Sequence, residues 1–150
     1  DVQEHADPWE ISGVATAKRS GDLSGLLLPA ERRIWVNARE AARSNARARF
    51  TIAHELGHWR LHSTGAGAHT RFCRPDDVGA TLSEITSSKR LESEANRFAA
   101  ELLMPAGRVR EEAEKARLSV PTLAKIFAVS AAAMQVRLEV LDLLPAYMRR

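Results

Sequence analysis

His54-Glu55-Leu56-Gly57-His58 lies inside a proline-free stretch, residues 44–62, which we predict to be a helix capped at its start by Ser44 or Asn45. In a helix the two histidines fall one turn apart, about 40° from each other around the axis, with Glu55 beside them. Two imidazoles in this arrangement can bind one metal ion, and a neighbouring carboxylate can act as a general base. The spacing H-E-x-x-H therefore predicts a metal site. A chance match is the alternative, and a third ligand would argue against it.

The opposite face of the same helix is apolar. Ile52, Leu56 and Trp59 cluster on the side away from the two histidines, so this side is predicted to pack in the core. Ala53 and Gly57 are small, which allows the backbone of another element to approach the helix closely. One face of the helix is thus expected to build the core and the other to present the polar residues.

A catalytic zinc site usually has three protein ligands and one water, so the chain must supply one more ligand. His62 lies two helical turns from His54, too far to share one ion with it. Leu61 and Thr64 occupy the positions where the longer pattern H-E-x-x-H-x-x-G-x-x-H requires Gly and His. We therefore interpret His62 as a residue at the helix end, with a contact to substrate or to the transition state as the alternative.

A second helix is predicted over residues 88–104, ending before Pro105. Two of its carboxylates point to solvent beside basic side chains: Glu94 and Glu101, with Arg90 and Arg97. Glu92 instead borders the apolar face, and an inward-facing carboxylate needs a partner. Glu92 is therefore the candidate third ligand, with an ordinary ion pair as the alternative. Asn96, one turn further on, could hold one of the ligands in place.

Two long segments carry a resemblance to a known family. They read His-Glu-Leu-Gly-His-Trp-Arg-Leu-His from His54 and Glu-Ser-Glu-Ala-Asn-Arg-Phe-Ala-Ala-Glu-Leu-Leu-Met-Pro from Glu92, and Arg49-Phe50-Thr51-Ile52-Ala53 precedes the first. Over residues 23–143 the chain resembles the ImmA/IrrE family of bacterial metallopeptidases. The resemblance implies that Glu92 is the third zinc ligand, as in other glutamate-zincins. It also implies a protein substrate, namely a helix-turn-helix repressor whose cleavage relieves repression of phage, mobile-element or stress-response genes.

The expected chemistry is peptide-bond hydrolysis by a zinc endopeptidase. Zn²⁺ held by His54, His58 and Glu92 would activate a water and polarise the scissile carbonyl. Glu55 would accept the proton of that water and pass it to the leaving amine. A donor to the oxyanion is also needed. The candidates are Tyr147, His5, His62 and His69, and His69, in a glycine-rich loop, is preferred to His62.

The 150 residues are predicted to form one domain, with a catalytic core over about residues 1–118 and C-terminal helices over about residues 119–150. No apolar run reaches the ~18 residues of a membrane span, and no signal peptide is visible. A single cysteine, Cys73, fits a reducing compartment, so the expected location is cytoplasmic. The chain begins at Asp1 rather than at Met, which leaves a preceding segment open. The oligomeric state is open as well.

The expected fold class is α+β, a mainly helical, zincin-like domain with a small antiparallel sheet beside the H-E-x-x-H helix. Residues 23–37 read as a hairpin, because two apolar runs flank Pro29. The hairpin is the candidate for pairing with extended substrate, and a purely structural sheet is the alternative. Residues 1–22 are expected to form a short helix or an arm. Residues 63–87 are expected to form a long loop that could act as a lid.

The C-terminal third is predicted to be helical. Residues 106–117 carry the alternating charges of an exposed helix. Two further helices, with Ser119 and Ser130 as N-caps, resemble a helix-turn-helix. Gln135 and Arg137 are nearly the only polar side chains near the start of the second of these helices. Packing or substrate docking is therefore favoured over the reading of DNA bases.

Charge leaves room for two other classes of function. The net charge is only +3, but arginines concentrate between residues 32 and 49: Arg32, Arg33, Arg39, Arg43, Arg47 and Arg49. We favour a solvated face over attraction to DNA or to an acidic partner. The competing classes are a DNA-binding protein with a vestigial zinc site and a metal-stabilised interaction module, including the toxin-antitoxin type. The intact Glu55 argues against both, because a structural zinc site needs no general base and more often has four protein ligands.

Overall fold

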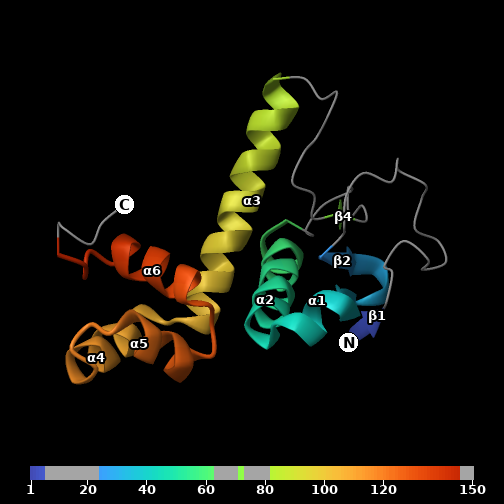
Figure 1. Cartoon of the computed structure of the whole chain (residues 1–150). Coiled ribbons are helices and arrows are strands. Elements are labelled where there is room, and N and C mark those ends of the chain that lie inside the picture. Colours follow the sequence, from blue (N-terminus) through green and yellow to red (C-terminus); the bar gives the residue numbers. More distant parts are fainter. Residues whose placement is uncertain (6–23, 63–70, 73–81, 146–150) are drawn as a thin grey trace.

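The computed structural model describes residues 1–5, 24–62, 71–72 and 82–145 (Figure 1). Within these ranges the fold is α+β, as predicted, with six helices and a small sheet. The strands are β1 (Val2–His5), β2 (Gly25–Leu28), β3 (Arg33–Asn37) and β4 (Arg71–Phe72). The helices are α1 (Ala38–Arg43), α2 (Asn45–His62), α3 (Leu82–Leu103), α4 (Ala106–Lys115), α5 (Val120–Phe127) and α6 (Ala131–Val140). None of these helices combines the length and the apolar character that crossing a membrane requires.

The sheet has the strand order β1-β3-β2-β4. β2 and β3 form the predicted antiparallel hairpin, in which Leu27 pairs with Ile34. The turn between them contains the short 3-10 helix Pro29–Glu31. Arg32 follows this helix as its C-terminal cap and has a left-handed backbone conformation, with φ 53°. β4 extends the sheet on the other side of β2 and is antiparallel to it.

Two expectations about the sheet were wrong. The expected short helix or arm over residues 1–22 is not present at residues 2–5, because β1 pairs in parallel with β3, and residues 6–22 lie outside the described residues. The hairpin is not at a sheet edge either, since β1 covers β3 and β4 covers Leu26 and Leu27 of β2. The outer strands of the described sheet are therefore β1 and β4, and the hairpin does not offer the free edge that substrate pairing would need.

Helix α2 packs its apolar face on the sheet. A core cluster of Leu27, Ile34, Val36 and Ala48 is flanked by Ile52, Leu56 and Trp59, the face predicted from the helical period. The Oγ atom of Ser44 accepts a hydrogen bond from the backbone N–H of Arg47 at 3.2 Å, so Ser44 is the N-terminal cap. The sheet thereby fixes the orientation of α2 and turns its polar face toward α3.

Helix α3 begins at Leu82 rather than at residue 88, so the last part of the predicted loop is helical. It crosses α2 at Gly57, where an added Cβ would lie 3.1 Å from the Cα atom of Ala95. The absence of a side chain at Gly57 is what allows this close approach. The remainder of the predicted lid, apart from β4, lies outside the described residues, as do Cys73, His69 and Tyr147.

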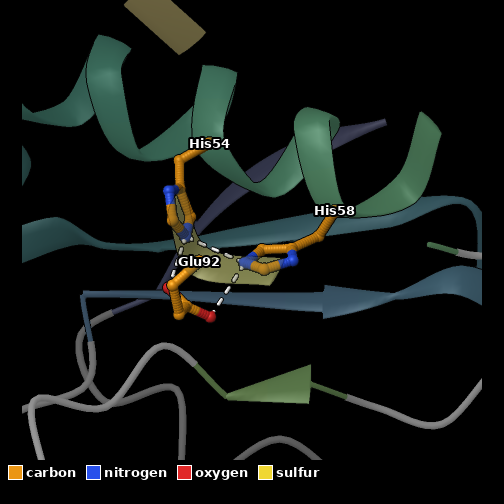
Figure 2. A group of neighbouring side chains, drawn as sticks. All are labelled: His54, His58 and Glu92. Atoms are coloured by element: carbon orange, nitrogen blue, oxygen red, sulfur yellow. Dashed lines mark hydrogen bonds and ion pairs between the residues drawn. The ribbon is translucent and has the colours of Figure 1, made fainter. Parts of the chain in front are cut away.

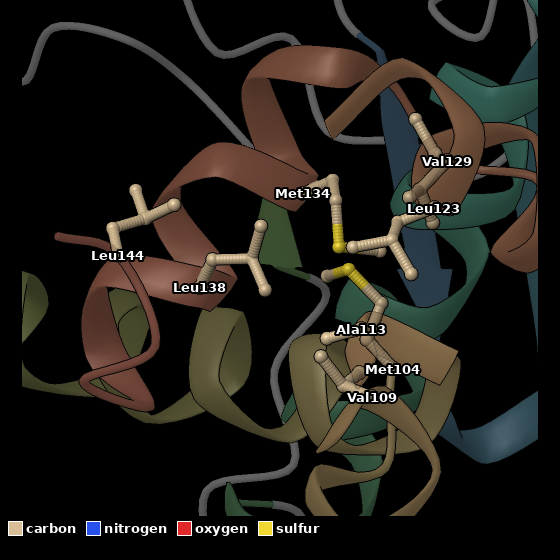
Figure 3. Packing of buried hydrophobic residues seen from close by; sticks show 9 residues of the cluster. Met104, Val109, Ala113, Leu123, Val129, Met134, Leu138 and Leu144 are labelled. Atoms are coloured by element: carbon tan, nitrogen blue, oxygen red, sulfur yellow. The ribbon is translucent and has the colours of Figure 1, made fainter. Parts of the chain in front are cut away.

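Helices α4, α5 and α6 gather around the C-terminal end of α3, on the side away from the sheet (Figure 1). Buried side chains of these helices and of the segments that flank them form a second core (Figure 3): Met104, Val109, Ala113, Leu123, Ala124, Val129, Met134, Leu138 and Leu144. α5 and α6 are joined by a tight turn in which Ala128 is left-handed, with φ 51°. Ser130 caps α6 because its side chain accepts a hydrogen bond from the backbone N–H of Ala133. Ser119 occupies the cap position of α5, but its side chain makes no capping hydrogen bond to the helix backbone.

Candidate metal centre

Three donor side chains from two helices converge at one point (Figure 2). His54 and His58 extend from the same face of α2, and their Nε2 atoms are 3.0 Å apart. Glu92 of α3 faces them, with carboxylate oxygens 3.2 Å from His54 Nε2 and 3.1 Å from His58 Nε2. The sequence-predicted residues therefore meet, although they lie far apart in the chain.

The geometry and the chemistry of these donors fit a small metal cation. In tetrahedral coordination with Zn–N bonds of about 2.0–2.1 Å, neighbouring ligand atoms lie about 3.3 Å apart. The observed separations of 3.0 to 3.2 Å require an expansion of only a few tenths of an ångström. Two imidazoles and one carboxylate are also a typical donor set of a catalytic zinc site, in which a fourth position stays open.

Asn96 orients one of the rings. The Oδ1 atom of Asn96 lies 2.9 Å from Nδ1 of His54, so the Nδ1–H group of the ring donates to the amide oxygen. The proton of a neutral His54 ring is then on Nδ1, and the lone pair of Nε2 points at His58 and Glu92. This is the role predicted for Asn96, one helical turn beyond Glu92 on α3.

The electrostatics of the cluster favour positive charge. Burial lowers the pKa of His54, but the hydrogen bond to Glu92 and the charges of Glu55 and Glu92 outweigh burial and raise that pKa above 6.5. Burial raises the pKa of Glu92, yet hydrogen bonds from His54 and His58 outweigh it and lower the pKa to about 2. Glu92 therefore stays ionised near neutral pH, and the site attracts a cation, either a proton or a metal ion.

Glu55 is fully buried beside the cluster, on the side of α2 that faces β2. A Cβ atom added at Gly25 would lie 3.0 Å from Oε1 of Glu55 and 2.6 Å from Cγ2 of Thr51. Gly25 thus leaves the space in which the Glu55 carboxylate sits. The sequence around Gly25 contains no pattern that would predict its contact with Glu55.

The other polar residues of the two helices lie outside the cluster. His62 is buried against α3, with its Nε2 atom 3.3 Å from the backbone oxygen of Leu91 and 3.8 Å from Glu94. It is a helix-end residue, as interpreted from the sequence. Glu94 also pairs with Arg90 at 2.8 Å, which agrees with the predicted solvated face. Among the described residues, only His54, His58 and Glu92 form a group that could hold a metal.

Glu101 has a partner that the sequence did not reveal. Its carboxylate lies 2.7 Å from the guanidinium of Arg137 on α6, whose side chain is only 3% exposed. Nε of Arg137 also donates to the backbone oxygen of Met104 at 3.0 Å. Arg137 therefore ties α6 to the end of α3, and its guanidinium is not available to contact DNA bases.

The fold and the site together define a metallopeptidase, in which one helix carries H-E-x-x-H and a second helix supplies a glutamate. The chain matches peptidase family M78, described as the IrrE N-terminal-like domain, over residues 11–139. It therefore belongs to the ImmA/IrrE family, as its two motifs indicate. No curated protein matches the chain.

Proposed function

We propose that this peptidase is a zinc-dependent endopeptidase in which His54, His58 and Glu92 bind zinc and Glu55 is the general base. The observation that carries the proposal is the convergence of two Nε2 atoms and one carboxylate within hydrogen-bonding distance of one another. The oriented His54 ring supports it further, because a ring held by Asn96 presents its lone pair without reorganisation.

The residues of the chain have distinct roles in the proposed reaction. Bound zinc would polarise the scissile carbonyl and lower the pKa of the attacking water to about 7. Glu55 accepts the proton of this water and returns it to the leaving amine. Burial of Glu55 excludes bulk water from that transfer. Asn96 keeps the His54 ring in one tautomer through the cycle.

The proposed substrate is a helix-turn-helix transcriptional repressor in the cytoplasm. Membership of the ImmA/IrrE family is the support for this choice. In this proposal the C-terminal helices α5 and α6 serve as packing and docking elements. The burial of Arg137 and the bond from Gln135 to Glu139 at 3.2 Å argue against their use as a DNA reader.

The experiment compares cells that express the natural protein with cells that express Glu55→Gln. The variant keeps the three proposed ligands, so it should retain zinc and lose cleavage. New protein N termini are identified by mass spectrometry in both cultures. We expect an N terminus inside a helix-turn-helix repressor that the variant does not produce. New N termini confined to other proteins would contradict the substrate, and equal cleavage by Glu55→Gln would contradict the mechanism.

A further inference from the structure

A cavity of about 480 Å³ lies between the start of α2 and the turn that joins α5 to α6. Its volume is in the range of about 300–1,000 Å³ that is typical of small-molecule sites. Neither the proposed zinc ligands nor Glu55 lines it, so it is separate from the metal centre. One wall belongs to the helix that carries H-E-x-x-H, and the other belongs to the C-terminal helices.

Among the residues that the structure describes, the charged side chains that line this cavity are all basic. Arg43 ends α1 and Arg47 lies in the first turn of α2. Arg43 makes no ion pair with any residue that the structure describes. Two guanidinium groups at one cavity provide planar, bidentate donors, which suit phosphate and carboxylate groups.

Hydroxyl groups add further donors. The Oγ atoms of Ser44 and Ser130 accept hydrogen bonds from the N–H groups of Arg47 at 3.2 Å and of Ala133 at 3.1 Å. A hydroxyl whose oxygen already accepts still has its proton to donate. Both serines line the cavity, together with Ser24 and Thr51. Because the two serines also start α2 and α6, the partial positive charges of both helix ends reinforce the arginines.

The remaining lining is apolar and includes Phe50, Val129 and Ala133. An inorganic anion alone would leave this surface uncovered, whereas a molecule with a phosphate and an apolar or planar body would cover both parts of the lining. We propose that this cavity binds a small phosphorylated molecule of about mononucleotide size. The phosphate lies between Arg43 and Arg47, and the body of the molecule rests on Phe50 and Val129.

The position of the cavity gives its occupant a route to the proposed active site. Thr51 lines the cavity and lies one helical turn before Glu55, and both side chains pack against Gly25. Val129, on the opposite wall, belongs to the core of the C-terminal helices. An occupant would therefore join the two parts of the fold beside the general base. This consequence rests on the proposed function, whereas the binding itself does not.

The test is a titration of the isotope-labelled full chain, followed by nuclear magnetic resonance, with the metal content that it has after purification. The probes are AMP, inorganic phosphate and adenosine. We expect AMP to shift the amide signals of Ala46 and Ala131 saturably. Phosphate should shift the same signals more weakly, and adenosine should not shift them. Since only binding is read, the result does not depend on zinc or on peptidase activity.

Three single variants sharpen the test. Arg43→Ala and Arg47→Ala should each weaken AMP binding at least about tenfold, because each removes charged hydrogen bonds to the phosphate. Arg39→Ala removes the same charge from an exposed side chain of α1 that does not line the cavity, and this variant should bind AMP like the natural protein. Circular dichroism confirms that each variant is folded.

Other results of the titration would overturn the proposal. Absence of saturable shifts with AMP and phosphate would do so, as would shifts at His54 and His58 alone, which would place the phosphate on the metal centre. Equal weakening by Arg39→Ala would reduce the effect to general surface charge. Stronger shifts of the same amides by duplex DNA than by AMP would assign the cavity to a nucleic-acid backbone.

Discussion

Nδ1 of His54 and Oδ1 of Asn96 lie 2.9 Å apart, and this contact joins the two helices of the candidate metal centre at one of its proposed ligands. The amide of Asn96 fixes the rotation of the ring and the location of its proton. Loss of such a partner typically lowers metal affinity about 10- to 100-fold. The ring of His58 has no corresponding partner at Nδ1 among the described residues, so the orientation of the site depends most on Asn96.

We predict that Asn96→Ala weakens zinc binding about 10- to 100-fold without unfolding the protein. The measurement is competition with a chromophoric chelator. Arg97→Ala is the matched control, since it changes an exposed neighbour on α3 that does not contact the cluster. An affinity for Asn96→Ala equal to that of Arg97→Ala would show that the contact does not orient the ligand.

Zinc affinity and the stability of the metal-free protein are predicted to depend on pH in opposite directions. The folded-state pKa of His54 is raised above its ordinary value of 6.5. Its protonation therefore stabilises the metal-free fold below pH 6.5, and this stabilisation is lost as pH rises through the raised pKa. Zinc requires the neutral ring, so its affinity should rise over the same interval.

The pKa of Glu92, lowered to about 2, lies outside this interval, so Glu92 adds no titration between about pH 5 and about pH 8. Denaturant unfolding of metal-free protein and chelator competition, both measured across that range, provide the test. Metal-free stability that increases from about pH 6.5 to about pH 8 would contradict the assigned His54–Glu92 interaction.

Gly57 and Gly107 provide a matched pair for the packing of α2 on α3. A Cβ at Gly57 would lie 3.1 Å from both the Cα and the backbone oxygen of Ala95, whereas a Cβ at Gly107 meets nothing within 4 Å. We predict that Gly57→Ala destabilises the fold by about 1–3 kcal/mol through overpacking. Gly107→Ala, in the first turn of helix α4, meets no such contact and should not destabilise the fold. Denaturant unfolding measures both, and a neutral Gly57→Ala would contradict the close crossing.

The ion pair between half-exposed Glu101 and buried Arg137 should contribute more to the free energy of unfolding than a pair in which both side chains are exposed. Removal of the Glu101 carboxylate leaves the buried guanidinium of Arg137 with only the Met104 carbonyl in the described part of the structure. We predict that Glu101→Ala costs about 1–3 kcal/mol of unfolding free energy. Glu111→Ala breaks the exposed pair with Lys115 and is the control, with little expected effect. Equal effects in thermal unfolding would show that burial of Arg137 does not matter.

The convergence of His54, His58 and Glu92 could be predicted because its signals are local. The spacing of His54 and His58 follows from one helical turn, and the inward position of Glu92 follows from the apolar pattern of its own helix. Asn96 was found in the same way. The convergence of these residues matches the prediction because the packing faces could be assigned from the sequence. Ile52, Leu56 and Trp59 pack against the sheet core, which leaves His54 and His58 on the face toward α3.

The remaining features depend on contacts between distant segments. β1 pairs in parallel with β3, and β4 covers β2. These two strands have only four and two residues, too few to show an alternating pattern of apolar and polar residues in the sequence. Residues 82–87 are rich in Ser and Thr, which favour turns, so the start of α3 was placed too late. The burial of Arg137 gives no signal within its own helix, because only the fold brings Glu101 and the Met104 carbonyl to it.

The most direct test of the account is the zinc content of the purified protein beside Glu92→Ala and Glu94→Ala, measured by elemental analysis in metal-replete, chelator-free buffer. Glu94 lies on the same helix but pairs with Arg90 outside the cluster, so it is the matched control. The account predicts about one zinc per chain in the natural protein and in Glu94→Ala, and its loss in Glu92→Ala. Full zinc in Glu92→Ala, or none in the natural protein, would contradict the three-ligand site.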